Sequence, residues 1–203
     1  MYIPSFNRIE DPAILLEAMR AYSFAVLFGP DSNGAPAATH LPLVIQPDGP
    51  HGTIEGHFAR ANPHWQSLAG RQTLVVFPGP HTYISPTLYA SQQSVPTWNY
   101  IAIHATGTLH LVEDEAGKET LLRNLIATHE PAFLEQWQSQ GEQYRAAMLK
   151  NIVGFRIPID RLEGKFKLSQ NRPDLDRASI QAAQAQGSAD EQALAAWMQR
   201  LHI

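Results

Sequence analysis

The chain has 203 residues and a formal net charge of −4, with 44% hydrophobic residues, 17% charged residues and no cysteine. This composition excludes an intrinsically disordered chain and provides enough apolar side chains for a sizeable core. The absence of cysteine excludes disulfides, thiolate metal ligands and thiol nucleophiles.

Strands joined by tight turns are expected in the N-terminal half, after one short helix. Asp11 and Pro12 are typical of the cap and the first position of that helix. A second short helix is expected after Asn62, again with a proline behind the cap. Apolar runs between turns that contain proline and glycine predict strands over 22–28, 37–45, 52–58, 73–77 and 98–112.

Helices are expected to dominate the C-terminal half. A helix starting at Asp114 is predicted from an apolar stripe formed by Leu121, Leu122, Leu125 and Ile126. Residues 143–149 read as a further helix and residues 152–159 as the last strand. After Pro173 the chain is rich in Ala and Gln and is expected to be helical, with a break near Gly187.

About six strands joined by tight turns, with helices inserted late, predict a small closed antiparallel barrel with flanking helices. We expect residues 1–172 to form this domain and residues 173–203 to form a helical extension packed on it. The sequence has no signal-peptide pattern and no apolar run near the ~20 residues of a membrane span, so we expect a cytoplasmic protein without a membrane partner.

Two polar stretches that carry aromatic residues are not obviously needed by the fold. They cover residues 79–86, running on to 95–100, and residues 167–173. Neither has a helical period, and their prolines are expected to exclude both from the middle of a sheet. Rigid turns with Trp, Tyr, His, Asn and Gln offer flat apolar faces beside hydrogen-bond donors. A planar ligand with polar edges is the expected occupant.

Two further motifs could contact a ligand. Pro42 cannot donate to a β ladder, so its strand should be bulged or at an edge, where open backbone could bond a ligand. On this motif alone, an ordinary barrel corner is the favoured explanation. In residues 56–65, free N–H groups at a helix N-terminus and Arg60 could hold a phosphate. Alternatively, Asn62 is only a cap and Arg60 is solvated.

Charge is distributed unevenly along the chain. Residues 1–144 carry six Lys and Arg against 13 Asp and Glu, whereas residues 145–177 carry eight against four. The basic segment is either a solvated face or a site for an anion.

Metal and hydrolase sites are not indicated. His57 and His64 are seven residues apart, and His104 and His110 are six apart, whereas one helical face needs a spacing of four. No HExxH, G-x-S-x-G or glycine-rich nucleotide loop is present, and no catalytic residue can be named.

Eight blocks in collinear order, from residue 1 to about residue 173, resemble the PaiB family of FMN-binding negative transcriptional regulators. Together they are specific in a way that no single block is. The blocks are residues 1–4, 38–42, 56–58, 62–65, 79–85, 95–100, 152–155 and 167–172.

The resemblance implies a mainly β fold with flanking helices, namely the FMN-binding split β-barrel of pyridoxamine-phosphate oxidase-like proteins, an antiparallel Greek-key barrel. It also implies a homodimer with FMN in the cleft between subunits, with residues 98–100 supplied by the partner. The implied FMN-binding residues are Thr39, His40, Leu41, His57, Phe58, Ala59, Arg60, Asn62, Trp98, Asn99, Tyr100, Lys167, Ser169 and Gln170. The wider group often has basic residues where this chain has residues 39–41, and Lys167 could supply the missing charge.

The implied function is a flavin-binding regulator that senses redox state or a metabolite, and the alternative is an FMN-dependent oxidoreductase acting on a small molecule. Direct DNA binding is doubtful because the chain is acidic and shows no helix-turn-helix with a basic recognition face. Residues 145–177 are the one candidate for such a surface.

Overall fold

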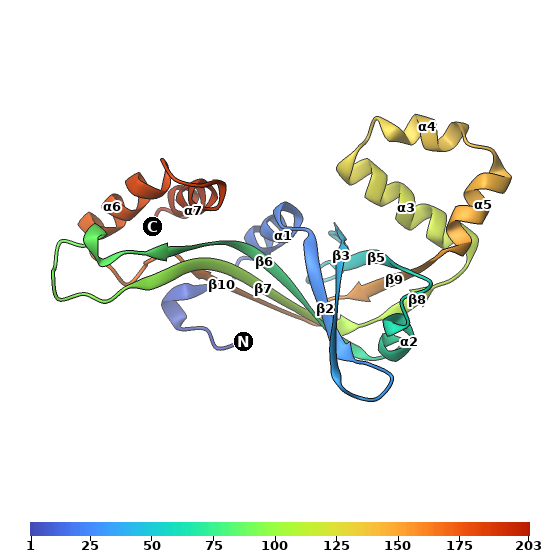
Figure 1. Cartoon of the computed structure of the whole chain (residues 1–203), viewed down its shortest axis with the longest axis horizontal. Helices are drawn as coiled ribbons and strands as arrows, with labels where there is room; N and C mark the ends of the chain where they lie inside the picture. The colour runs from blue at the N-terminus through green and yellow to red at the C-terminus, as the bar shows by residue number, and fades with distance from the viewer. The chain divides into compact units, whose positions relative to one another are not determined.

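The computed structural model describes residues 1–203 as two compact units (Figure 1). Unit 1 contains Met1–Asp11, Pro78–Ile103 and Glu163–Ile203, and unit 2 contains Pro12–Phe77 and His104–Leu162. The long strands β6 (Gln72–Ile84) and β7 (Thr97–Thr108) each contribute residues to both units.

Unit 2 combines antiparallel strands with five helices. Its other strands are β2 (Phe24–Pro30), β3 (Pro36–Pro42), β4 (Val44–Gln46), β5 (Thr53–Ala59), β8 (His110–Val112) and β9 (Ile152–Pro158). Its helices are α1 (Pro12–Ala21), α2 (His64–Leu68), α3 (Glu115–His129), α4 (Phe133–Ser139) and α5 (Glu142–Lys150). One sheet has the order β4-β5-β9-β8, and β2 lies between β3 and β6 in the other.

The core of unit 2 follows from the alternation of apolar residues along these strands. Phe58 on β5 and Phe155 on β9 are fully buried, with ring centroids 5.0 Å apart. Gly56 lies directly opposite Phe155, and a Cβ at Gly56 would come within 2.8 Å of that ring. The aromatic packing therefore requires glycine at this position on β5.

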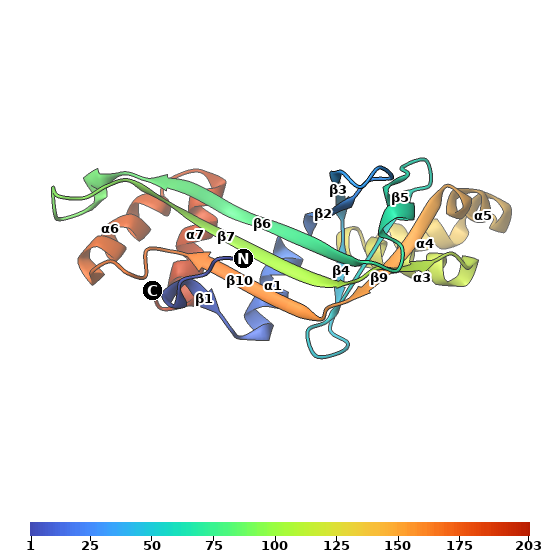
Figure 2. The ribbon, with the colours of Figure 1, turned by 90° about the horizontal axis from the view of Figure 1, so that it is seen from below.

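Unit 1 is built on strands that run side by side in Figure 2, covered by two C-terminal helices. Its elements are β1 (Arg8–Ile9), most of β10 (Arg161–Lys167), parts of β6 and β7, the short helices η1 (Ser5–Asn7) and η2 (Pro86–Leu88), α6 (Asp174–Gln184) and α7 (Ala189–Arg200). Phe166 packs edge-on against Trp197 with centroids 5.2 Å apart, and Leu194 and Met198 are fully buried. Leu194, Trp197 and Met198 form the buried face of α7.

A capping box fixes the start of α7. Ser188 N donates to Glu191 Oε2 at 2.7 Å, and Glu191 N donates to Ser188 Oγ at 3.4 Å. Thr82 on β6 donates to the other carboxylate oxygen of Glu191 at 3.2 Å. The bonds from Ser188 hold the pKa of the Glu191 carboxyl below its usual value. The break expected near Gly187 is thus a new helix start tied to β6.

The mainly β class with flanking helices is confirmed. The prediction for the polar stretch after residue 78 is corrected. Pro78 and Pro80 lie within β6, which continues to Ile84, although the sequence predicted a turn there. The pairing of β6 with β2 covers only residues 74–76. The pairing with β2 ends at Val76, so the prolines that follow remove no β2 ladder bond.

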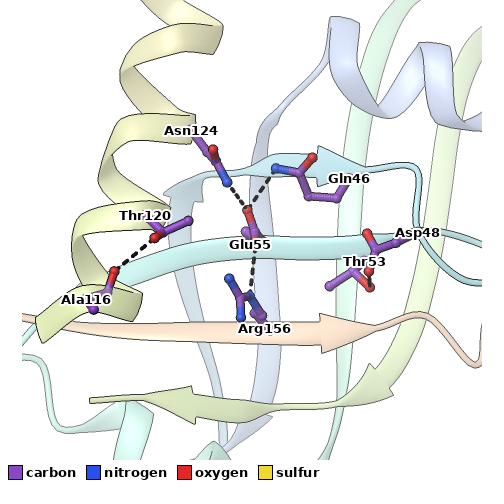
Figure 3. A network of polar contacts seen from close by, with 8 residues as sticks. All are labelled: Gln46, Asp48, Thr53, Glu55, Ala116, Thr120, Asn124 and Arg156. Carbon is purple, nitrogen blue, oxygen red and sulfur yellow. Dashed lines mark hydrogen bonds and ion pairs between the residues drawn. The ribbon is translucent and has the colours of Figure 1, made fainter. Parts of the chain in front are cut away.

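Glu55 is a buried carboxylate at the centre of unit 2 (Figure 3). Its Oε2 accepts hydrogen bonds from Gln46 Nε2 at 2.9 Å and from Asn124 Nδ2 at 2.8 Å. Its Oε1 accepts from Arg156 Nε at 2.8 Å. These bonds join β5 to β4, α3 and β9, and they satisfy a charge that would otherwise be costly to bury.

Replacing Glu55 with alanine is expected to lower the free energy of unfolding by about 2–3 kcal/mol, because three donors lose their acceptor. Urea denaturation at neutral pH measures this loss. The exposed Glu135 on α4 is the matched control, and Glu135→Ala should change stability by less than about 0.5 kcal/mol. Equal effects of the two substitutions would show that the network contributes nothing.

Candidate functional site

The predicted FMN-binding residues fall into two groups, one in each unit. Unit 2 holds Thr39, His40, Leu41, His57, Phe58, Ala59, Arg60 and Asn62. Unit 1 holds Trp98, Asn99, Tyr100, Lys167, Ser169 and Gln170. Each group is described on its own below.

Strand β3 is an edge strand, as Pro42 predicted, and it presents two different faces. One face carries His40, which is exposed and stacks on Phe24 of β2 with ring centroids 6.3 Å apart. Phe28 lies on the same face, and Phe24 and Phe28 are 63% and 40% exposed. Two large aromatic side chains beside an imidazole form an apolar platform open to a partner.

The other face of β3 lines a cavity of about 390 Å³, to which Thr39, Asn62 and His64 contribute. Thr39 Oγ1 lies 2.8 Å from His64 Nδ1 and accepts a hydrogen bond from Asn62 Nδ2 at 3.4 Å. His64 N donates to Asn62 Oδ1 at 3.0 Å, so the three side chains form one network. Nε2 of the buried His64 has no partner. The Thr39 hydroxyl is therefore held in place at the cavity wall.

The charge of this cavity differs from that of a phosphate pocket. Asp31 is its one charged lining residue, and neither Lys nor Arg lines it. Helix α2 has only five residues, so its macrodipole is small, and Asn62 already accepts from its first N–H group. The cavity offers uncharged donors, which suit the carbonyl and hydroxyl groups of a flavin, and positive charge must come from elsewhere.

Arg60 is anchored to the backbone of its own unit. Its Nε donates to the carbonyl of Lys150 at 2.8 Å and its Nη2 to the carbonyl of Ile152 at 3.1 Å. Its Nη1 lies 3.7 Å from an exposed carboxylate, that of Glu113. These contacts tie the end of β5 to the α5–β9 connection and leave few donors for a ligand.

The neighbours of Arg60 on β5 are divided between the core and the surface. Phe58 is fully buried against Phe155, so its ring belongs to the core. Ala59 is exposed at the strand end. Burial lowers the pKa of His57, which favours its neutral imidazole near pH 7.

In unit 1, Lys167 joins the end of β10 to the start of β7. Its Nζ donates to Thr97 Oγ1 and, at 2.6 Å, to the carbonyl of Trp98. Burial is the first cause that lowers the pKa of Lys167, followed by the charges of Lys165 and Arg172. This ammonium group has two uncharged acceptors and keeps its positive charge uncompensated.

Aromatic side chains surround the start of β7. Trp98 is 52% exposed and packs edge-on against Tyr83, with ring centroids 6.0 Å apart. His81 belongs to the same cluster, and its ring centroid lies 6.2 Å from that of Trp98. Tyr100 is half-buried beneath the Lys165 ammonium, 5.3 Å from its ring centroid.

Ser169 and Gln170 shape the loop after β10. Ser169 has a φ of 65°, unusual for a residue other than glycine, and its Oγ donates to Asn99 Oδ1 at 3.0 Å. Gln170 Oε1 accepts from the backbone N–H of Leu168 at 2.7 Å, and its Nε2 donates to the carbonyl of Phe166. The Gln170 amide is thereby used within the loop, so its structural contribution is to hold the loop closed.

The sequence interpretation missed three residues that the structure adds to these groups. His64 positions Thr39, Thr97 binds Lys167, and Arg172 lies beside Lys167 in the same pocket. All three occur inside blocks that had already been singled out. Residue type alone gave no reason to choose them over their neighbours.

No group of three or more His, Asp or Glu side chains is placed to hold a metal ion. No helix combines the length and the apolar character that crossing a bilayer requires.

Comparison with solved structures supports the fold. The FAD and heme binding protein from Mycobacterium smegmatis is similar with a TM-score of 0.65 and 15% identity, over 85% of this chain and 80% of that one. The flavocytochrome Anf3 from Azotobacter vinelandii gives a TM-score of 0.65 and 16% identity, over 87% and 78% of the two chains. The split-barrel class predicted from the sequence is confirmed, with the strands hydrogen-bonded as two sheets.

Comparison of sequences identifies the family. The family model "Putative FMN-binding domain" matches residues 1–161. The chain is 36% identical over 185 residues to "Protease synthase and sporulation protein PAI 2" of Bacillus subtilis (strain 168), covering 89% of this chain and 87% of that protein. A fungal relative, "Uncharacterized protein AN0679" of Emericella nidulans, is 31% identical over 182 residues, covering 70% and 72%. FMN is accordingly confirmed as the cofactor, and the chain belongs to the PaiB family of FMN-binding split-barrel proteins.

Proposed function

We propose that the protein is a flavin-linked regulator, which senses redox state or a metabolite through FMN. The observation that carries this proposal is the cavity behind edge strand β3, where the Thr39 hydroxyl is held by Asn62 and His64. The name of the Bacillus subtilis relative, "Protease synthase and sporulation protein PAI 2", supports a regulatory role.

The side chains of this chain fit the chemical needs of FMN. A flavin needs an apolar surface for its ring, hydrogen-bond partners for its polar edge, and positive charge for its phosphate. Thr39 and Asn62 offer uncharged donors at the cavity. Phe24 and Phe28 lie on the opposite face of the β2–β3 pair and offer an apolar surface there. Arg60 in unit 2 is the candidate for the charge, although two of its donors are held by the carbonyls of Lys150 and Ile152. FMN itself would supply reversible electron transfer.

A regulatory role through direct DNA contact has little support in the charge distribution. In the basic segment, Arg145, Arg156 and Arg177 each form an ion pair with a carboxylate, at 3.5, 2.8 and 2.8 Å. Their charge is partly neutralised before any phosphate approaches, and residues 1–144 have an excess of acidic residues. We therefore propose that regulation passes through flavin chemistry or a partner protein.

A homodimer with the flavin at the subunit interface completes the proposal. Several large aromatic side chains are exposed, with Phe24, Tyr83 and Trp98 each about half exposed or more. Exposed apolar surface of this kind is typical of an interface with another protein. Large aromatic residues dominate protein interfaces when they become buried. A second copy of the chain would cover them and part of the flavin.

Replacing Thr39 with valine should weaken FMN binding by about 1–2 kcal/mol, because the substitution removes the hydroxyl and keeps the shape. Fluorescence titration with FMN measures the effect. The control is Thr120→Val, since the Thr120 hydroxyl bonds only to the Ala116 carbonyl in its own helix. Unchanged FMN affinity in the Thr39 variant would remove this face of β3 from the flavin site.

A regulator should not turn over its flavin as an enzyme does. We expect the FMN-loaded protein, mixed with NADH or NADPH and an electron acceptor, to show less than one oxidation cycle per flavin in stopped-flow absorbance. Free FMN at the same concentration sets the background rate. Sustained multiple turnover above that background would favour the oxidoreductase alternative.

The dimer is tested by Trp98→Ala, with Tyr144→Ala as a control matched in exposure at 52%. We expect Trp98→Ala to weaken both dimerisation and FMN affinity by at least fivefold, on the scale of an interface aromatic residue. Light scattering over a concentration series and FMN titration give the two quantities. A wild-type monomer with full FMN occupancy would contradict the proposal.

A further inference from the structure

Unit 1 contains a second polar pocket that the flavin proposal does not use as a whole. Its volume is about 210 Å³. It is lined by Val95, Pro96, Thr97, Lys167, Ser169, Asn171 and Arg172. Two of these side chains are cationic and none is acidic, so the pocket has the charge expected of an anion site.

Arg172 presents an unused guanidinium to this pocket. Its carbon Cζ lies 3.9 Å from the centre of the Tyr89 ring, and Tyr89 is 8% exposed. The backbone of Arg172 is fixed at both ends, since its N–H donates to the Ser169 carbonyl at 2.9 Å and its own carbonyl accepts from Arg177 Nη1 at 2.6 Å. The guanidinium donates to no acceptor within the protein. Stacking orients the planar fork and leaves its donors available.

Lys167 adds a second charge whose neighbours do not neutralise it. The ammonium group donates two of its three N–H groups to the Thr97 hydroxyl and the Trp98 carbonyl, and neither acceptor carries a negative charge. Burial and then the charges of Lys165 and Arg172 lower the pKa of Lys167. Lys165 and Arg172 thus lie close enough to repel the Lys167 ammonium group, and a bound anion would relieve that repulsion.

Acidic side chains near in sequence are engaged in other contacts. Asp174 pairs with Arg177 at 2.8 Å, and Asp176 accepts from the backbone N–H of Ala90 at 2.9 Å. Glu163 binds the N-terminal ammonium group at 3.2 Å. None of these three contacts involves the side chain of Arg172 or Lys167.

The loop that carries the pocket is held in a strained conformation. Ser169 is 4% exposed and has its φ at 65°, a left-handed conformation that is unfavourable for a residue with a side chain. Its Oγ donates to the wholly buried Asn99, whose Nδ2 has no acceptor. Strain of this kind is retained where the surroundings fix it, often at ligand sites.

We propose that this pocket binds a small oxyanion, a carboxylate or phosphate group on a ligand other than FMN, with Arg172 as the bidentate donor and Lys167 as a point charge. The volume suits an anionic group and not a whole nucleotide. The site does not depend on flavin binding. If the protein senses a metabolite, an anionic one fits this pocket.

Inorganic phosphate is the probe for this proposal. Titration of the full-length wild-type protein, followed by ³¹P NMR line width, should show saturable binding that weakens with added NaCl. Arg172→Gln should weaken phosphate binding at least tenfold, the scale of lost hydrogen bonds to a charged group. Arg172→Lys keeps the charge and loses the planar guanidinium, so its phosphate affinity should lie between those of the wild type and Arg172→Gln.

The control for general charge is Arg71→Gln, because Arg71 is exposed and lies in unit 2. This variant should bind phosphate as the wild type does. Thermal melts followed by circular dichroism confirm that each variant is folded. Absence of saturable binding by the wild type, or equal binding by folded Arg172→Gln, would overturn the proposal.

Flavin titrations separate the two possible sources of the anion. If the ligand is distinct from FMN, the ratio of FMN to riboflavin affinity should be the same in wild type and Arg172→Gln. A ratio that falls toward one in the variant would assign the pocket to the phosphate of FMN and overturn the proposed separate ligand. A protein that binds phosphate and no flavin would refute only the proposed flavin-linked function.

Discussion

A buried carboxylate, Glu55, connects four elements of unit 2, among them β5, whose end leads to Asn62 and His64 of the candidate site. Its hydrogen bonds to Gln46, Asn124 and Arg156 join the central strand β5 to β4, α3 and β9. Because the Arg156 side chain is 43% exposed and that of Glu55 only 6%, the pair is solvated at one end and buried at the other. The cost of burying the charge is thus offset by three donors and partial solvation.

The two candidate ligand sites are formed by departures from regular secondary structure. In unit 2, Pro42 ends the edge strand β3, which carries the exposed His40 beside Phe24 on one face and Thr39 beside a cavity on the other. In unit 1, the left-handed conformation of Ser169 turns the chain after β10. This turn allows Lys167 and Arg172 to line one pocket although they are five residues apart.

The electrostatics of these sites differ, and this difference bears on function. The cavity at Thr39 contains uncharged donors and one carboxylate, whereas the pocket at Arg172 contains two cations and no acid. A protein with an excess of acidic residues that concentrates unpaired cations in a small pocket is better suited to small anions than to a nucleic acid. This contrast favours a sensor of small molecules over a direct DNA-binding protein.

Much of the local structure could be read from the sequence because short-range rules govern it. Asp114 caps α3 by accepting from Gly117 N at 2.7 Å, and the break near Gly187 begins α7 with a capping box. The collinear blocks also indicated the family, because a match of sequence blocks can be recognised without knowledge of the structure. The course of β6 could not be predicted, since Pro78 and Pro80 are tolerated only because the pairing with β2 ends at Val76.

Which side chains are free for a ligand was decided by tertiary structure. Arg60 looked like a phosphate ligand by type and position, but its guanidinium is bound to the carbonyls of Lys150 and Ile152. In the sequence Arg172 is one more charge in a basic segment. In the structure its guanidinium is stacked on Tyr89 and its N–H donors are available to a ligand. The sequence by itself determined the class of fold, the family and the cofactor. Only the tertiary structure decided which donors are bonded within the protein and which are free, because their acceptors lie far away in the sequence.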